Sequence, residues 1–160
     1  FLLQSRVGTV IRANFDKETG MAQASYRNEA FKAFDVEQFD IRIVDTNGGL
    51  PKAKDLALLL RLCGGFGEPG AASPAVFVHC KSGFGRSVVL ACCLECHRSN
   101  LSGAALLGWA RIARPGAVTT REQEAFLKSI RGREDVARLA QLAPEGRDPG
   151  RAPCMGCCVQ

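Results

Sequence analysis

The chain has 160 residues, of which 46% are hydrophobic and 23% are charged, and its formal net charge is +5. This length supports one domain with a hydrophobic core, and the ordinary composition excludes a disordered or fibrous chain. Basic residues are interspersed with acidic ones, so no nucleic-acid-binding surface is indicated.

The residue pattern predicts alternating strands and helices. In chain order they are a strand over 8–12, a helix over 21–34, a strand over 39–44, a helix over 52–63, a strand over 75–78, and helices over 87–97, 103–113, 121–131 and 133–142. Ser102 and Thr120 are expected to cap the two helices that follow them. The alternation predicts one α/β domain over residues 1–142, with a central, mainly parallel β-sheet flanked by helices.

The predicted helix over 21–34 has apolar residues at helical spacing. Tyr26, Ala30, Phe31 and Phe34 are its candidate core contacts. From residue 143 onwards Pro, Gly and Arg dominate, so residues 143–160 are predicted to form a flexible tail.

The segment 79–87 reads HCKSGFGRS and lies between a predicted strand and a predicted helix. A loop this short can direct several backbone N–H groups at one centre, where Gly83 and Gly85 permit unusual backbone angles. Arg86 adds a planar donor for two phosphate oxygens. The backbone N–H groups and the positive charge of Arg86 together favour the thiolate form of Cys80. The spacing therefore predicts a phosphate cradle with a cysteine nucleophile, rather than a buried cysteine beside a glycine turn with Arg86 at the surface.

This segment resembles the signature loop of the protein tyrosine and dual-specificity phosphatases. VGTVIRAN, FDIRIVDTNGG and GWARIARPGAVTTREQEAFL resemble other parts of the same family, closest to its mitotic-exit and regenerating-liver branches. The resemblance covers roughly residues 1 to 130 and implies the protein tyrosine phosphatase-like fold, with a first strand or hairpin missing before residue 1. It also implies hydrolysis of phosphotyrosine and/or phosphoserine and phosphothreonine in a phosphoprotein substrate, through a phosphocysteine intermediate.

The resemblance assigns roles to further residues. Asp45 is the expected general acid, on a loop that departs from the family's usual D-G-x-x-P, and Asp40 is the reserve candidate. His79 is expected to order the loop, or simply to be a buried structural residue. Ser87 is expected to contact the cysteine sulfur, or to cap the next helix.

Two residues after the signature helix also have expected roles. Gln123 is expected to orient the attacking water, or to be an ordinary exposed helix residue. Arg114 is expected to order the region under the signature loop. The residues expected to bind phosphate are Lys81, Ser82, Gly83, Phe84, Gly85 and Arg86. An apolar Phe84 favours a phosphoprotein over an inositol phosphate.

The chain ends Cys157-Cys158-Val159-Gln160, a C-a-a-X box that favours farnesylation of Cys157. Because one prenyl chain anchors weakly, a second signal such as palmitoylation of Cys154 is expected. The cysteines and the absence of a signal peptide predict a reducing, cytoplasmic location, on the cytosolic face of a membrane if the tail is prenylated. Zinc binding by the pairs Cys93/Cys96 and Cys154/Cys157 is the alternative, and no metal site is predicted.

The sequence thus predicts a cofactor-independent phosphatase. A weakly active, phosphatase-like module that regulates a membrane partner is the alternative, and retention of Asp45 and Ser87 argues against it. A third possibility is another cysteine-loop enzyme, such as a sulfurtransferase or arsenate reductase. The oligomeric state is not predicted.

Overall fold

The computed structural model describes residues 4–46, 49–63 and 75–142. Its sheet has three parallel strands, β1 (Val7–Arg12), β2 (Glu37–Asp40) and β3 (Ala75–His79), in the order β2-β1-β3. Ile11 of β1 pairs with Phe39 of β2 and with Val78 of β3. The α/β class and the parallel sheet are confirmed.

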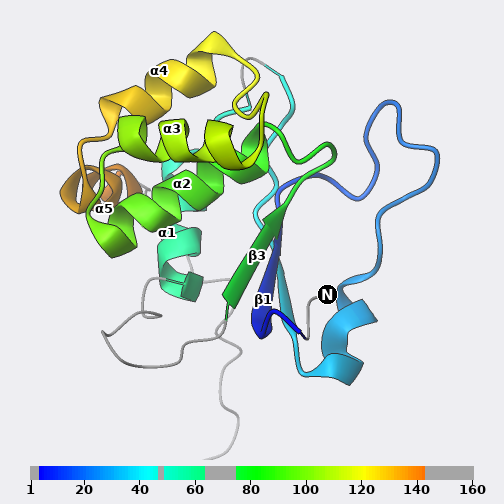
Figure 1. Cartoon of the computed structure of the whole chain (residues 1–160). Coiled ribbons are helices and arrows are strands. Elements are labelled where there is room, and N and C mark those ends of the chain that lie inside the picture. The colour runs from blue at the N-terminus through cyan, green and yellow to red at the C-terminus, as the bar shows by residue number, and fades with distance from the viewer. Residues whose placement is uncertain (1–3, 47–48, 64–74, 143–160) are drawn as a thin grey trace, which may run out of the picture.

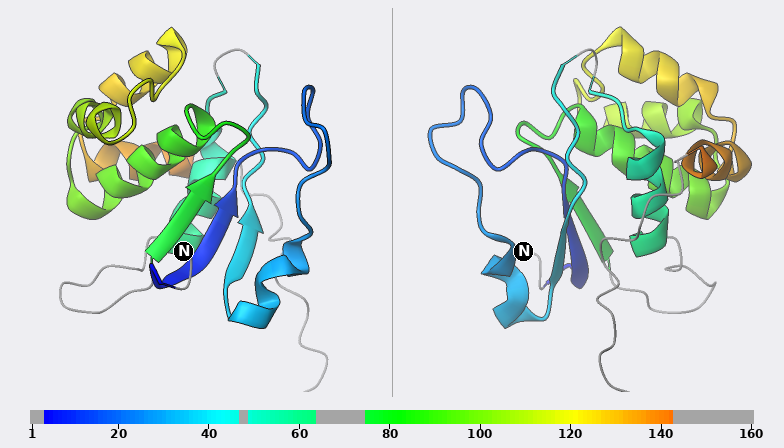
Figure 2. Two further views of the ribbon diagram at one scale, coloured as in Figure 1. Left: turned by 45° about the vertical axis from the view of Figure 1, so that its right-hand side comes forward. Right: turned by 180° about the vertical axis from the view of Figure 1, so that it is seen from behind.

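Within the described residues, five α-helices gather on one side of the sheet, and the short 3-10 helix η1 (Asn28–Phe34) lies on the other side (Figures 1 and 2). The α-helices are α1 (Ala53–Cys63), α2 (Arg86–Ser99), α3 (Gly103–Ala113), α4 (Arg121–Ser129) and α5 (Arg133–Gln141). None of the helices in the described ranges is long and apolar enough to cross a membrane.

The main hydrophobic core lies between the sheet and the α-helices. It includes Ile11, Ile41, Leu59, Val89 and Leu90, all almost completely buried. Since α2 follows β3 closely and contributes Val89 and Leu90 to this core, the loop between them is held at its α2 end by buried structure.

The predicted helix caps are confirmed. The Ser102 hydroxyl accepts a hydrogen bond from the Ala105 N–H, and the Thr120 hydroxyl accepts one from the Gln123 N–H. Each cap satisfies a backbone donor that the first helical turn leaves without a partner.

The helix predicted over 21–34 is wrong. Only η1 forms, Ala30 and Phe34 are exposed, and Tyr26 and Phe31 are partly buried. The buried guanidinium of Arg12 accounts for the difference, because it donates hydrogen bonds to the Tyr26 carbonyl and to the Asn28 side chain. These two contacts draw the segment before η1 towards Arg12 instead of into a helical turn.

The strand predicted over 39–44 is displaced towards the N-terminus. Beyond β2, the Ile41 N–H donates to the Arg12 carbonyl and the Ile43 N–H donates to the Ala13 carbonyl, although these residues lie outside the assigned strand. Ile41 and Ile43 are buried and Arg42 is exposed, so the alternation on which the prediction rested is present.

Candidate active site

The predicted site residues converge where β1 and β3 end. The loop from Cys80 to Gly85 leaves β3 and enters the N-terminus of α2, while residues 13–27 follow β1 and residues 41–46 follow β2 (Figure 1). Since the carboxyl ends of parallel strands lie at one edge of the sheet, all three segments meet beside the first turn of α2.

Cys80 is buried at the base of the loop, with its sulfur surrounded by donors. Its Sγ lies 3.3 Å from the Ser87 hydroxyl and accepts a hydrogen bond from the Gly83 N–H at 3.3 Å. Burial opposes ionisation of the thiol. Hydrogen bonds from the Ser87 side chain and backbone and from Gly83, with the charge of Arg86, outweigh burial and lower the pKa of Cys80.

Ser87 contacts the sulfur as the family resemblance implies. It does not cap α2, because the capping position belongs to Gly85 and α2 begins at Arg86.

Arg86 is almost completely buried, with 2% of its side chain exposed. Its Nη1 donates to Glu18 at 2.6 Å and to the Ile43 carbonyl at 3.0 Å. Its Nη2 donates to the other Glu18 oxygen at 2.9 Å and to Asp45 at 3.2 Å. The protein's own oxygens thus occupy four of the five guanidinium N–H groups, and Nε–H has no partner among the described residues.

Asp45 reaches the site while its side chain stays 62% exposed. Asp40, the reserve candidate for the general acid, does not reach it. Asp40 pairs instead with buried Arg12 at 2.8 Å. Burial opposes ionisation of Asp40, but hydrogen bonds from Arg12 and Gln38 dominate and lower its pKa, so Asp40 is a structural residue.

His79 is half-buried and joins the loop to the segment before η1. Its Nδ1 lies 3.3 Å from the Cys80 carbonyl, and its Nε2 is hydrogen-bonded to the Tyr26 hydroxyl. Burial lowers the pKa of His79 and raises the pKa of Tyr26 to about 12, so both side chains are neutral at pH 7. His79 therefore acts as a bridge within the site.

Gln123 is buried, with 2% of the residue exposed, and is not an ordinary surface residue of α4. Its Oε1 accepts a hydrogen bond from the Thr119 N–H at 3.2 Å. A methyl group at Gly85 would stand 2.9 Å from its amide nitrogen, and one at Gly49 would stand 3.4 Å from it. The amide therefore lies against both the phosphate loop and the acid-bearing loop, and glycine at these two positions leaves room for it.

The remaining loop residues form the rim. Lys81 donates to the Thr19 carbonyl, and Arg114 donates to the Ser82 carbonyl. The Arg114 guanidinium stacks over the Phe84 ring at 4.2 Å from its centroid. Gly83 has φ 72°, the left-handed conformation for which glycine is favoured.

Sequence reasoning missed Glu18 and Tyr26. Arg86 lowers the pKa of Glu18, mainly through hydrogen bonds to its carboxylate, and keeps it ionised. The sequence carries a signal for Glu18: it is an acidic residue shortly after the predicted strand over 8–12, and parallel strands end at one edge of a sheet. Nothing in the spacing of Tyr26 points to His79.

The lipidation site Cys157 and its neighbours Cys154 and Cys158 lie outside the described residues. Cys93 and Cys96 are buried in α2, and burial raises the pKa of both thiols, that of Cys96 to about 11. Within residues 4–46, 49–63 and 75–142, no three His, Cys, Asp or Glu side chains gather in a way that could hold a metal ion.

The chain is similar in sequence to dual-specificity protein phosphatases. It is 27% identical over 128 residues to "Dual specificity protein phosphatase CDC14A" of Mus musculus, covering 80% of this chain and 18% of that protein. The human CDC14A protein is 28% identical over 98 residues, covering 61% of this chain and 15% of that protein. The chain thus spans less than a fifth of the length of these curated relatives. No protein-family model matches it.

Solved structures show the same fold. The crystal structure of PTPMT1 in complex with PI(5)P superposes with a TM-score of 0.67 at 21% identity, covering 86% of this chain and 83% of that one. The Yvh1 phosphatase domain from Chaetomium thermophilum gives 0.58 at 21% identity, covering 87% and 84%. The protein tyrosine phosphatase-like fold expected from the sequence is therefore confirmed. The sequence similarity to dual-specificity phosphatases supports the resemblance to that family.

Proposed function

We propose that this protein is a phosphoprotein phosphatase that forms a phosphocysteine intermediate on Cys80. The observation that carries the proposal is the environment of the Cys80 sulfur. It lies at the base of a loop whose Gly83 N–H and Ser87 hydroxyl face it, next to the buried guanidinium of Arg86. A thiolate in this position can attack a phosphorus atom held by the loop amides and by Arg86.

In the first step the Cys80 thiolate forms a sulfur–phosphorus bond as the bond to the leaving oxygen breaks. Asp45 supplies the proton for that oxygen, after releasing Arg86 to the incoming phosphate. Its exposure and its place on the loop that follows β2 favour this movement.

In the second step a water molecule attacks the phosphocysteine, and Asp45 accepts its proton. The amide of Gln123, against Gly85 and Gly49, is placed to orient this water. The Ser87 hydroxyl stabilises the thiolate that leaves. Phosphate departs, and Cys80 is regenerated.

The test is hydrolysis of p-nitrophenyl phosphate by the wild type, by Cys80→Ser and by Cys96→Ala. Cys96 is buried in α2 and has no role in the proposed steps, so Cys96→Ala is the matched control. We expect turnover to be lost in Cys80→Ser alone, and rapidly quenched wild type to carry a phosphoryl group on Cys80. Equal rates in wild type and Cys80→Ser would overturn the proposal.

We propose phosphotyrosine and/or phosphoserine and phosphothreonine in proteins as the substrate. The names of the sequence relatives support a protein substrate, and the apolar rim residue Phe84 suits a peptide better than a highly charged inositol ring. A panel of phosphopeptides tested beside PI(5)P separates the two classes. Turnover of PI(5)P alone would contradict the proposed substrate without affecting the proposed mechanism.

We also propose that Cys157 is farnesylated and that the tail attaches the protein to the cytosolic face of a membrane. The C-a-a-X box supports this, and the net charge of +5 favours an anionic surface. Intact mass of the protein expressed in eukaryotic cells tests it, with Cys157→Ser as the control. An unmodified Cys157 would contradict it.

A further inference from the structure

The Ser82–Gly83 peptide faces two partners on opposite sides. Its N–H, which belongs to Gly83, donates to the Cys80 sulfur at 3.3 Å. Its carbonyl, which belongs to Ser82, accepts a hydrogen bond from Nη2 of Arg114 at 3.2 Å. Because a peptide unit is planar and its N–H and C=O point in opposite directions, these two contacts constrain a single orientation.

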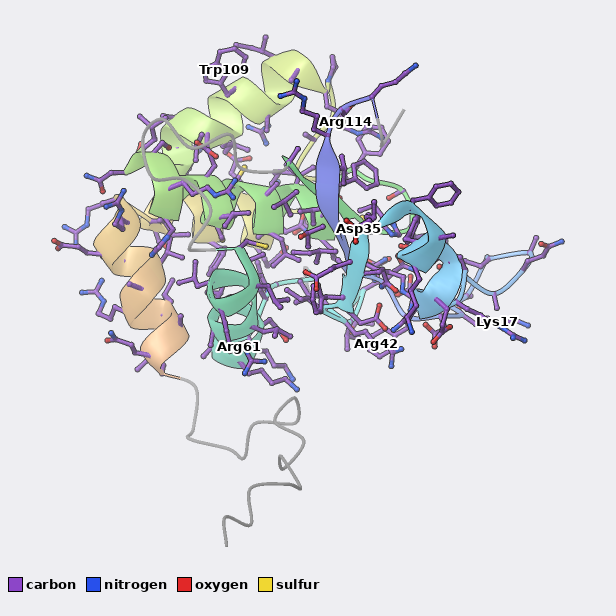
Figure 3. All side chains as sticks on the ribbon, turned by 90° about the horizontal axis from the view of Figure 1, so that it is seen from below. Lys17, Asp35, Arg42, Arg61, Trp109 and Arg114 are labelled. Atoms are coloured by element: carbon purple, nitrogen blue, oxygen red, sulfur yellow. The ribbon has the colours of Figure 1, made fainter. Side chains whose placement is uncertain are left out.

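Arg114 is itself held in place. It follows α3, where its N–H donates to the Ala110 carbonyl at 2.8 Å, and its guanidinium stacks over the Phe84 ring. The Phe84 carbonyl accepts a hydrogen bond from the Val118 N–H at 2.7 Å, so the backbone that carries the ring is tied to the segment that leads into α4. Figure 3 labels Arg114 and the exposed Trp109 of α3, which line one cavity together with Ser82 and Gly83.

The opposite orientation of this peptide would harm the site. A half-turn of the Ser82–Gly83 unit would point the Ser82 carbonyl oxygen at the Cys80 sulfur and repel a thiolate. Gly83 makes such a turn accessible, because glycine adopts positive and negative φ about equally well. Its missing side chain also admits Arg114: a methyl group there would stand 3.2 Å from Nη2.

We propose that Arg114 is a positioning residue, which acts through the Ser82 carbonyl to hold the Gly83 N–H towards the Cys80 sulfur. Its hydrogen bond in the loop is to the Ser82 carbonyl, and the bond to the sulfur comes from the Gly83 N–H. Its effect is to keep one amide dipole of the cradle directed at the nucleophile, and the proposal takes from the proposed function only that Cys80 is the nucleophile.

The competing explanation is the bare charge of Arg114 acting through space. Arg114 is exposed, so such an effect would be screened at high salt, where the Debye length falls to about 3 Å. A hydrogen bond that fixes a peptide plane does not depend on ionic strength in this way.

Arg114→Lys keeps the charge and a donor of nearly the same reach.

The experiment follows alkylation of Cys80 by iodoacetamide against pH, with the modified peptide identified by mass. The proteins are wild type, Arg114→Ala, Arg114→Lys and Arg121→Ala, which removes an exposed arginine of α4. We expect the alkylation midpoint of Arg114→Ala to rise by about one pH unit, so that its rate below the midpoint falls about tenfold. Arg114→Lys should recover most of this loss, and Arg121→Ala should match the wild type.

An unchanged midpoint in folded Arg114→Ala, or a shift that vanishes at about 1 M salt, would overturn the proposal. Circular dichroism establishes that each variant is folded. Phe84→Leu, which removes the stacked ring, should shift the midpoint in the same direction as Arg114→Ala. Alkylation requires no turnover, so a protein without phosphatase activity could still pass this test, and an active one could fail it.

Discussion

Glu18 and Arg86 form a two-point ion pair, with oxygen–nitrogen distances of 2.6 and 2.9 Å, inside the candidate site. The carboxylate is tied to its own loop, because Glu18 also accepts a hydrogen bond from the Phe15 N–H at 2.9 Å. The pair engages both terminal nitrogens of the guanidinium and leaves Nε outside it. This geometry fixes the plane of the side chain proposed to hold phosphate.

Replacing Glu18 with glutamine removes the charge and one of the two acceptors. Arg86 would then be less constrained, and we expect kcat/KM for p-nitrophenyl phosphate to fall about tenfold, roughly 1.4 kcal/mol of transition-state stabilisation. Glu29→Gln, on the exposed η1, is the control. A rise in kcat/KM would show instead that Glu18 competes with the substrate.

Removing the Ser87 hydroxyl should alter the pH dependence of the reaction. The pKa of Cys80 is lowered despite burial, and Ser87 supplies the leading contacts that lower it. Ser87→Ala should therefore raise that pKa and move the acid limb of kcat/KM to higher pH. At pH values where Cys80 is ionised in both the wild type and the variant, kcat/KM should change little. Ser99→Ala, at the exposed end of α2, serves as the reference, and coincident acid limbs would refute the assignment.

Asp45→Asn removes the proposed proton donor and keeps the side-chain shape. We expect kcat to fall by about 10² to 10³ for an alkyl or phenyl phosphate, whose leaving group needs the proton. The loss should be much smaller for p-nitrophenyl phosphate, which has a better leaving group. Measuring both substrates decides the point, since an equal loss for both would exclude a general-acid role.

Asp40→Asn should affect stability more than chemistry. It would leave the buried Arg12 without its two-point partner, so we expect a loss of about 3 kcal/mol in the free energy of unfolding at pH 7. The pKa of Asp40 is lower in the folded state, so its contribution is present at neutral pH and disappears as pH falls through that lowered pKa. The difference from wild type should therefore shrink in acid, as denaturant titrations at pH 7 and pH 3 can check. A difference independent of pH would contradict this account.

The residues predicted at the centre of the candidate site come together because they are close in the chain. Cys80, Gly83, Arg86 and Ser87 lie within eight consecutive positions between a strand and a helix, so the chain brings them together once those elements form. The same locality explains why the caps at Ser102 and Thr120 are confirmed.

The parts that could not be predicted depend on long-range contacts. Glu18 reaches Arg86 across 68 positions, and Tyr26 reaches His79 across 53, through a segment whose path follows neither helical nor strand periodicity. The wrong helix over 21–34 has the same origin. A pattern of apolar residues carries no information about a buried arginine that captures the carbonyl of Tyr26.

The occupied donors of Arg86 make anion binding an exchange equilibrium. A phosphate that takes a second guanidinium N–H beside Nε–H must displace Asp45 or Glu18, and exposed Asp45 is the easier of the two to displace. Occupying the cradle and freeing the carboxylate are then thermodynamically linked, and each favours the other. Even inorganic phosphate should therefore loosen the loop that carries Asp45, and a variant lacking the Asp45 carboxylate should bind phosphate more tightly than the wild type does.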